Sequence, residues 1–287
     1  MKKHHLALLS FLSLLVFWGS GFLAIRVGLE GFPPFFFMAS RFLIGGSLLF
    51  AVLSARGHRL PRPREWGFAF LEGLLLMVGG GGALAYAQRS IGSGLAAVGI
   101  ATVPIWAALF SGLFGQWPSR MEWAGIGIGF AGVLLLNLKG ELRADPTGAL
   151  LLFTSAVTWA FGSILSRRLP LPRGLMAAAS EMLAGGLALI PLGYFLGERL
   201  TGLPPLRPLL GLLYIAIPGS AIAFGAYTYL LQNVRPALAT SYTYINPAIA
   251  LGLGVLLAGE RITRTEIAAV GAILCGVAVI VLSRNQR

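Results

Sequence analysis

Long apolar segments, separated by short polar stretches, follow one another along the whole chain. A helix needs roughly 20 apolar residues to cross a bilayer. Segments near this length are expected to form ten helices, at residues 6–25, 33–53, 66–86, 94–114, 123–138, 147–165, 175–195, 209–230, 237–258 and 265–282. The polar stretches between them are too short to form a soluble domain. The pattern therefore predicts an all-α polytopic membrane protein with ten transmembrane helices.

The second half of the chain repeats the first at an offset of about 140 residues. The segment Trp-Gly-Ser-Gly-Phe at 18–22 returns as Trp-Ala-Phe-Gly-Ser at 159–163, and Pro104 returns as Pro247. We therefore expect two five-helix repeats, at residues 1–140 and 141–287. Because five is an odd number, the repeats must enter the membrane from opposite sides. Inverted repeats of this kind form the two gates of alternating-access transporters.

Charged residues are scarce, and the basic ones are unevenly distributed. The chain is 56% hydrophobic and 11% charged, with a mean hydropathy of +0.81, whereas a soluble domain has about a quarter charged residues. A cytoplasmic N-terminus puts thirteen Lys and Arg on the cytoplasmic side and eight on the other, with Arg41 inside a span. This bias follows the positive-inside rule. The basic excess thus indicates a lipid bilayer rather than nucleic acid as partner, and both termini are predicted to be cytoplasmic.

Residues 1–25 also have features of a secretory signal peptide, because Lys2 and Lys3 precede an apolar run and small residues. Cleavage is not expected, since the segment around Trp18 has its counterpart around Trp159 and its removal would leave one repeat a helix short. The single cysteine, Cys275, excludes an intramolecular disulfide.

Residues that catalyse reactions inside membranes are largely missing from the spans. Asp145 is the single aspartate and lies in a loop, and the three histidines lie at the cytoplasmic edge. No lysine follows a phosphate-binding glycine loop. The GxGxxG at 127–132 lies inside an apolar span, so close helix packing explains it better than a dinucleotide site. We expect no enzyme activity, no metal and no cofactor.

Three charged residues inside the predicted spans are candidates for gating or structural roles. Arg41 and Glu181 stand at equivalent positions, 140 residues apart, and they either form a salt bridge or reach separate polar partners. Glu72 either couples transport to protons or reaches cytoplasmic water from the edge of its span. Arg41 is expected to support folding or gating more than substrate contact.

Aromatic side chains gather in the first, third, fourth, sixth, eighth and ninth segments, and the ninth is also the most polar. These segments supply the candidates for substrate binding: Trp18, Tyr86, Trp106, Trp159, Tyr227, Tyr229, Tyr242 and Asn246. Pro104 and Pro247 are expected to kink their helices and to free carbonyl groups four residues earlier. Such kinks occur beside binding sites at repeat interfaces, but ordinary kinking of membrane helices explains them equally well.

Several short segments together resemble the two EamA repeats of the drug/metabolite transporter superfamily, over essentially the whole chain. They are Pro33-Pro34 with 37–43, the helix at 96–104, Asn246-Pro247, and 259–263 leading to Gly271 and Gly276. The resemblance implies ten helices in two inverted five-helix repeats, around a central cavity lined by spans one, three, four, six, eight and nine. Arg41 and Glu260 match the family's recurring arginine and glutamate, whereas Gln116 replaces the glutamate of the first repeat.

Within that superfamily, the aromatic-rich cavity looks most like those of bacterial exporters of aromatic and neutral amino acids. A neutral, aromatic pocket suits apolar side chains by stacking and burial. We therefore expect a secondary transporter of the inner membrane that exports small neutral metabolites, amino acids above all, by alternating access. No obligatory protein partner is expected. The alternatives are an intramembrane enzyme and a lipid-handling or assembly scaffold without transport.

Overall fold

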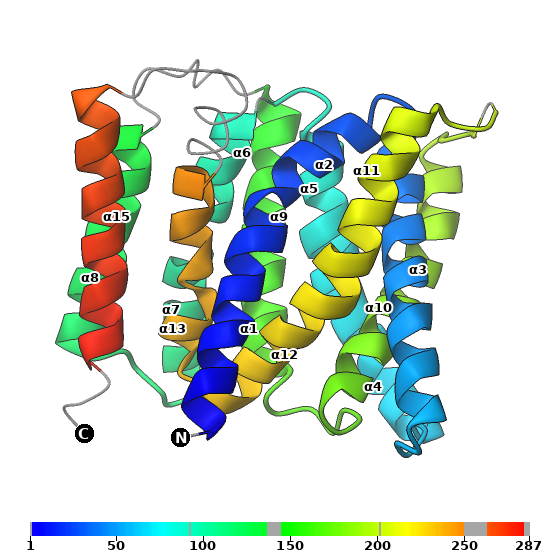
Figure 1. Cartoon of the computed structure of the whole chain (residues 1–287), viewed down its shortest axis with the longest axis horizontal. Helices are drawn as coiled ribbons and strands as arrows, with labels where there is room; N and C mark the ends of the chain where they lie inside the picture. The colour runs from blue at the N-terminus through cyan, green and yellow to red at the C-terminus, as the bar shows by residue number, and fades with distance from the viewer. Residues whose placement is uncertain (1, 92, 137–144, 201, 250–262, 284–287) are drawn as a thin grey trace.

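The computed structural model describes residues 2–91, 93–136, 145–200, 202–249 and 263–283, and the regular elements in this part of the chain are all helices (Figure 1). The predicted all-helical fold is confirmed. In the first half the helices are α1 (Lys2–Gly19), α2 (Gly21–Gly28), α3 (Pro34–Ala55), α4 (Pro63–Gly73), the π-helix η1 (Leu74–Gly82), α5 (Ala83–Ala87), α6 (Ser93–Ile100), α7 (Val103–Leu113) and α8 (Arg120–Leu136).

The second half follows the same order of long helices. It contains α9 (Pro146–Leu165), α10 (Leu175–Phe195), α11 (Leu206–Ala216), the π-helix η2 (Ile217–Ile222), α12 (Ala223–Asn233), α13 (Pro236–Thr240), a helical stretch at 242–249, and α15 (Arg264–Leu282). Both π-helices interrupt the third long helix of their half, so this irregularity also recurs in the repeat.

Among the described residues, six stretches rather than ten are long and apolar enough to cross a membrane. They are His5–Gly28, Pro34–Ala55, Pro63–Ala87, Pro146–Leu165, Leu175–Phe195 and Leu206–Asn233, and two shorter apolar helices are Val98–Leu113 and Ile267–Leu282. The segment predicted at 94–114 is divided between α6 and α7, and the one at 123–138 is the short helix α8. The segment predicted at 237–258 extends into residues outside the described ones.

Equivalent helices of the two halves run in opposite directions. α1 begins at the lower end of the bundle in Figure 1, whereas α9, its counterpart, begins at the upper end. We refer to the lower end as the α1 end of the bundle. α15 also ends there, so the described chain begins and finishes at the same end.

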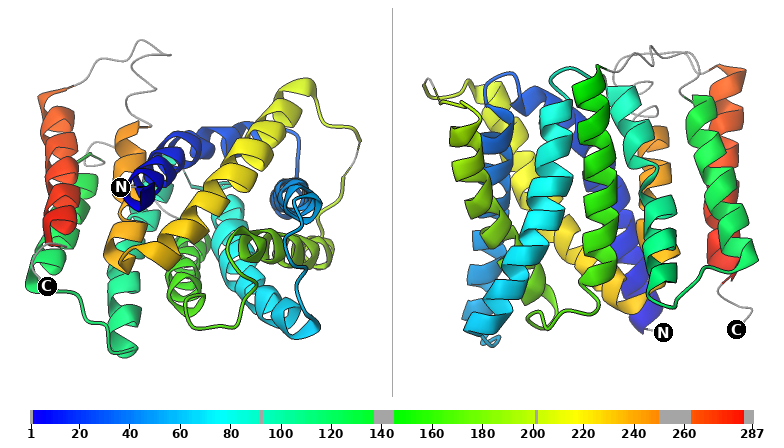
Figure 2. Two further views of the ribbon diagram at one scale, coloured as in Figure 1. Left: turned by 60° about the horizontal axis from the view of Figure 1, so that its bottom comes forward. Right: turned by 180° about the vertical axis from the view of Figure 1, so that it is seen from behind.

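Two helix pairs, one helix from each half, pack along most of their lengths: α3 with α10, and α8 with α15. The second pair stands at one side of the bundle (Figure 2). Small residues bring its backbones together, since a Cβ on Gly125 would lie 2.8 Å from the Gly276 carbonyl oxygen and one on Gly132 would lie 2.8 Å from Ile273 N. These glycines flank and end the GxGxxG segment, and their contacts support its interpretation as a packing motif.

Glu198, just beyond the end of α10, caps the start of α3. Its carboxylate accepts hydrogen bonds from the Phe35 N–H at 3.1 Å and the Phe36 N–H at 3.2 Å, which belong to the first helical turn and have no partner within the helix. Glu198 is buried. The two halves are thereby joined at the end of the bundle opposite the α1 end.

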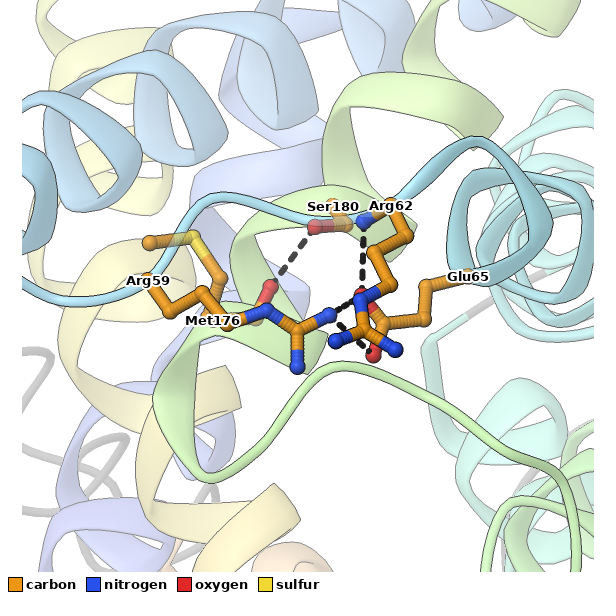
Figure 3. Close-up of polar contacts among 5 residues, drawn as sticks. All are labelled: Arg59, Arg62, Glu65, Met176 and Ser180. Carbon is orange, nitrogen blue, oxygen red and sulfur yellow. Dashed lines mark hydrogen bonds and ion pairs between the residues drawn. The ribbon is translucent and has the colours of Figure 1, made fainter.

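The start of α4 lies beside the first turns of α10, at the α1 end (Figure 3). Glu65 Oε2 accepts a hydrogen bond from the Arg62 N–H at 2.6 Å and pairs with Arg59 Nη2 at 2.8 Å. Nearby in α10, Ser180 Oγ donates to the Met176 carbonyl at 2.8 Å. The arginine-rich segment at 56–64 is therefore held in a defined turn at the start of α4.

Candidate functional site

Trp18 of α1 lies at the centre of a cluster of aromatic rings from both halves of the chain. Its ring centroid is 5.5 Å from that of Trp159, 5.3 Å from Tyr227 and 5.1 Å from Tyr242, and 6.3 Å from Phe224. Trp18, Tyr227 and Tyr242 are almost completely buried. Edge-to-face and tilted contacts at these separations are the favoured geometries of aromatic pairs.

The polar tips of the cluster have hydrogen-bond partners. Trp18 Nε1 donates to the Gly219 carbonyl at 2.6 Å, and Trp159 Nε1 donates to the Tyr227 hydroxyl at 3.1 Å. The Tyr227 hydroxyl also shares a hydrogen bond of 2.6 Å with Ser163 Oγ. The rings are therefore fixed in orientation as well as packed.

The two π-helices supply the surfaces on which these rings rest. A Cβ on Gly80 of η1 would lie 2.6 Å from the Trp159 ring, so only a glycine admits the tryptophan there. The Gly80 carbonyl accepts a hydrogen bond from Ser155 Oγ at 2.7 Å. In η2, the Gly219 carbonyl accepts the bond from Trp18. A π-helix changes the backbone pairing locally and is frequent at functional sites.

A cavity of about 80 Å³ lies against this cluster, between the two halves of the chain. Its wall is mostly apolar and is formed by Trp18, Gly21, Phe22, Ile25, Met38, Arg41, Phe42, Gly80, Gly81, Leu84, Ile100, Val103, Ser155, Trp159, Ile215, Tyr242 and Asn246. Asn246 is 3% exposed, and its Oδ1 atom has no hydrogen-bond partner. A buried amide oxygen without a partner is costly, so the cavity wall offers an acceptor for a ligand donor.

Arg41 provides the cationic group in this wall. Its Nε donates to Ser220 Oγ at 2.9 Å, its guanidinium lies 4.9 Å from the Phe42 ring centroid, and Ser220 Oγ donates in turn to the Ile215 carbonyl at 3.1 Å. The serine therefore holds one edge of the guanidinium, while the arginine as a whole borders the cavity.

Arg41 and Glu181 do not form the salt bridge considered from the sequence; no ion pair joins them in the described part of the chain. Contacts of Gly46 with Met182 and of Gly186 with Leu43 set the register of α3 against α10. In that register the two charges are offset by seven residues, or about 10 Å along the helices. Equivalent positions in antiparallel helices lie at different depths, which is why this pair does not meet.

The structure brings together Trp18, Trp159, Tyr242 and Asn246 in the cavity wall, with Tyr227 directly behind them. Three other candidates lie outside that wall. Tyr86 packs on Phe35, with ring centroids 5.3 Å apart, and Trp106 packs on Phe153 at 5.4 Å, between α7 and α9.

Tyr229, the third of these candidates, is partly exposed on α12, two residues beyond the buried Tyr227. Successive residues on a helix point to different sides, so membership of a cavity-lining helix does not place a side chain in the cavity. Sequence reasoning missed Met38, Phe42 and Ser220. The run of four glycines at 79–82 could have indicated Met38 and Phe42, because both side chains pack directly against Gly81, where a Cβ would collide with them.

Pro104 separates two helices instead of kinking one. α6 ends at Ile100 and Pro104 is in the first turn of α7, where a missing N–H costs no helical hydrogen bond. Thr102 Oγ1 donates to the Gly99 carbonyl at 2.6 Å across the break. Pro247 lies within the helical stretch at 242–249, and Glu260 lies outside the described residues.

Glu72 and Glu181 lie outside the central cavity, at 0% and 2% exposure, in α4 and α10. Groups of three or more side chains able to ligate a metal are not found in the residues that the structure describes.

Comparison with known proteins agrees with this two-part architecture. The model of the EamA-like transporter family matches residues 5–138 and again residues 146–282. The chain is 45% identical over 273 residues to the uncharacterized inner membrane transporter YedA of Escherichia coli (strain K12), covering 95% of this chain and 89% of that protein. The resemblance recognised in the sequence is confirmed.

Two more distant proteins are also similar to this chain. The probable terminal-alkyne amino-acid exporter of Streptantibioticus cattleyicolor is 28% identical over 253 residues, covering 85% of this chain and 83% of the exporter. A solved crystal structure shares the fold with a TM-score of 0.83 at 24% identity, covering 97% of this chain and 99% of that one.

Proposed function

Because the chain belongs to the EamA-like transporter family, we propose that it is a secondary transporter that exports small neutral metabolites by alternating access, with neutral and aromatic amino acids as the favoured substrates. It acts in a bacterial-type inner membrane. The family match in both halves and the similarity to the inner membrane transporter YedA support this assignment.

The proposed topology has ten spans in two inverted five-helix repeats, residues 1–140 and 141–287, with both termini in the cytoplasm. The opposite directions of α1 and α9 and the common end at which α1 begins and α15 finishes support it. In this orientation the α1 end is cytoplasmic, which also places the arginine-rich turn before α4 on the cytoplasmic side.

The composition of the central cavity is the observation that carries the substrate proposal. The rings of Trp18, Trp159 and Tyr242 receive an apolar or aromatic side chain, where burial and ring contacts are favourable. Asn246 Oδ1 accepts a hydrogen bond from the amino group, and Arg41 donates to the carboxylate. A ligand with both charges and no net charge therefore fits this wall better than a cation or a polyanion. Arg41 then has a binding role beyond the gating or structural role expected from the sequence.

The similarity to the probable terminal-alkyne amino-acid exporter of Streptantibioticus cattleyicolor supports amino acids as substrates. Tyr86, Trp106 and Tyr229 are left out of the proposed site because they lie outside the cavity wall.

Flux from liposomes that contain the purified protein tests the proposal. Liposomes loaded with radiolabelled phenylalanine, leucine, lysine or glutamate are diluted, and release is compared with that from protein-free liposomes. Release of phenylalanine or leucine above this control is expected, with little release of lysine and glutamate. Chemical conversion of the label without flux would favour the enzyme alternative, and neither flux nor conversion across a wider metabolite panel would favour a scaffold.

A further inference from the structure

Two glutamates lie side by side inside the half of the bundle nearest the α1 end. Glu72 is the penultimate residue of α4, and Glu181 lies six residues after the start of α10, about 9 Å along that helix. The two helices are in backbone contact there, since a Cβ on Gly73 would lie 2.8 Å from the Glu181 carbonyl oxygen and 2.6 Å from Gly185 N. Glu72 immediately precedes Gly73, so the two glutamates are neighbours across this contact, and two carboxylates placed near each other repel.

Among the described residues, neither carboxyl group has an ion-pair partner. Glu72 is completely buried, and both of its carboxyl oxygens lack a hydrogen-bond partner. The ion pairs found among the described residues involve Glu65, Glu30 and Glu122, not this pair. An unpaired carboxylate is far more costly to bury than a neutral carboxylic acid, and two adjacent carboxylates make the cost larger. The close packing of α4 on α10 is therefore compatible with one bound proton. It is unfavourable when both carboxyl groups are charged.

The other helices packed around the pair bring hydroxyl groups and no cation to it. α9 contributes Gly162, whose added Cβ would lie 3.1 Å from Glu72 Oε2, and beside it Ser163. α12 contributes Tyr227, whose hydroxyl shares a hydrogen bond of 2.6 Å with Ser163 Oγ. α3 brings no titratable residue to this depth, since its turns at 45–53 are apolar apart from Ser47.

The pair lies between the α1 end and the central cavity. On one side, Glu181 borders a small cavity of about 10 Å³, lined also by Ser166, Leu171 and Gln232, which lie near the ends of α9 and α12. A space of this size holds about one water molecule.

On the other side, Glu72 lies beside Gly162 of α9. The next residue, Ser163, shares a hydrogen bond with the Tyr227 hydroxyl, which also accepts one from the Nε1 of Trp159, a residue of the central cavity wall. Polar groups thus run from the α1 end, through the two glutamates, to the central cavity.

We propose that Glu72 and Glu181 together form a binding site for one proton, which is exchanged with the cytoplasmic side and controls the opening of the seam between α4, α10 and α12. This rests on the proposed transport function and adds its coupling ion. With the proton bound, the seam is closed, and the close packing of Gly73 against α10 in this structure corresponds to that form. Loss of the proton leaves a charged carboxylate that requires water, and this favours an open, hydrated seam. Through Tyr227 and Trp159 the same change reaches the substrate cavity.

Proton binding is tested without substrate by infrared titration of the purified protein in detergent. The wild type is expected to show a carboxylic-acid band that titrates with pH, and this band is expected to be lost in Glu72→Gln and altered in Glu181→Gln. Glu198→Gln is the matched control, because Glu198 is also buried but accepts backbone hydrogen bonds; it should leave the band in place. A band that persists unchanged in both Glu72→Gln and Glu181→Gln would overturn the proton site.

Coupling is tested in liposomes with radiolabelled phenylalanine, with and without an imposed pH gradient. Stimulation of wild-type flux by the gradient, and its loss in Glu72→Gln but not in Glu198→Gln, is the expected result. Wild-type flux that ignores both pH and the gradient would overturn coupling and leave the transporter assignment intact. If no tested compound crosses the membrane, the transport proposal fails and coupling fails with it, while the infrared titration still decides whether the proton site exists.

Discussion

Trp18 and Trp159 occupy equivalent positions in the two repeats and meet edge to face, with ring centroids 5.5 Å apart and ring planes at 77°. Equivalent residues touch only where the halves approach their relating axis, so this contact marks the centre of the repeat interface. Their hydrogen bonds nevertheless differ, since Trp18 donates to the Gly219 carbonyl and Trp159 to the Tyr227 hydroxyl. The two halves therefore differ in their hydrogen bonding at their common centre.

That difference predicts unequal effects of the same substitution. Trp18→Phe keeps a ring but leaves the buried Gly219 carbonyl without its donor, which should cost about 1–3 kcal/mol of stability. Trp159→Phe should cost less, because the Tyr227 hydroxyl keeps its bond to Ser163. Denaturant unfolding of both variants in detergent measures the difference. Equal losses would show that the indole hydrogen bonds do not distinguish the two positions.

Substrate affinity should depend on Tyr242 and be insensitive to Trp106. Tyr242→Ala removes a ring from the cavity wall and should weaken binding by about 1–3 kcal/mol, as for a desolvated aromatic contact. Trp106→Ala removes an aromatic ring that packs on Phe153 outside the cavity. The concentration dependence of phenylalanine flux measures both, with insertion and folding checked by gel filtration. A comparable loss of affinity in Trp106→Ala would place the site elsewhere.

Arg41 should be energetically coupled to Ser220. In a double-mutant cycle with Arg41→Met and Ser220→Ala, an interaction energy of about 0.5–3 kcal/mol in stability is expected, because the two side chains share a hydrogen bond of 2.9 Å. Exchanging Arg41 and Glu181 should rescue neither single substitution, since the helix register separates them. Rescue by the exchange would mean that α3 and α10 slide to another register during transport.

Asp145 should contribute stability that is lost in acid. It caps α9 by accepting hydrogen bonds from Gly148 N at 3.0 Å and Thr147 N at 3.3 Å. The Gly148 bond, with help from Thr147 and Ser90, holds the pKa of Asp145 below its ordinary value. The contribution is therefore fully present above the ordinary aspartate pKa and declines as pH falls through the lowered folded-state pKa.

Thermal unfolding of Asp145→Asn between about pH 3 and pH 7 measures this contribution. The variant keeps a capping side chain but loses the titration, so its stability should fall less steeply than that of the wild type toward acid pH. Parallel curves for the two proteins would show that the Asp145 carboxylate does not contribute through its charge.

The apolar pattern was sufficient to predict the class of fold. A helix that crosses a bilayer must satisfy all its backbone hydrogen bonds internally, and the sequence of each such helix is a long apolar run. The apolar pattern was less reliable for the extent of the helices in the fourth and ninth segments, because turns divide those apolar runs into shorter helices. A turn such as the one at Thr102 depends on local side-chain hydrogen bonds, and these do not alter hydropathy.

Of the side chains expected from the sequence, Trp18, Trp159, Tyr242 and Asn246 line the central cavity, whereas α3, which was not expected there, also contributes Met38, Arg41 and Phe42. Repeat alignment drew attention to Trp18 and Trp159, and the structure places both at the centre. It could not distinguish Tyr227 from Tyr229, since the face of a helix depends on its packing partners. Nor could it place Arg41 relative to Glu181, because depth along antiparallel helices is set by glycine contacts between distant segments.

The π-helices η1 and η2 have a consequence for the rotation of the helices that follow them. A π-helical stretch pairs residue i with i+5, so it accommodates more residues per turn than the α-helix around it. If such a stretch reverted to α pairing, the helix beyond it would turn by about 100° for each residue released. Residues of α5 and α12 would then face different neighbours without any tilt of the helix axis. An added Cβ on any of the four glycines at 79–82 would lie within 3 Å of Thr158, Trp159, Met38 or Leu189, so a change of pairing in η1 would be passed directly to the tryptophan cluster and the cavity wall.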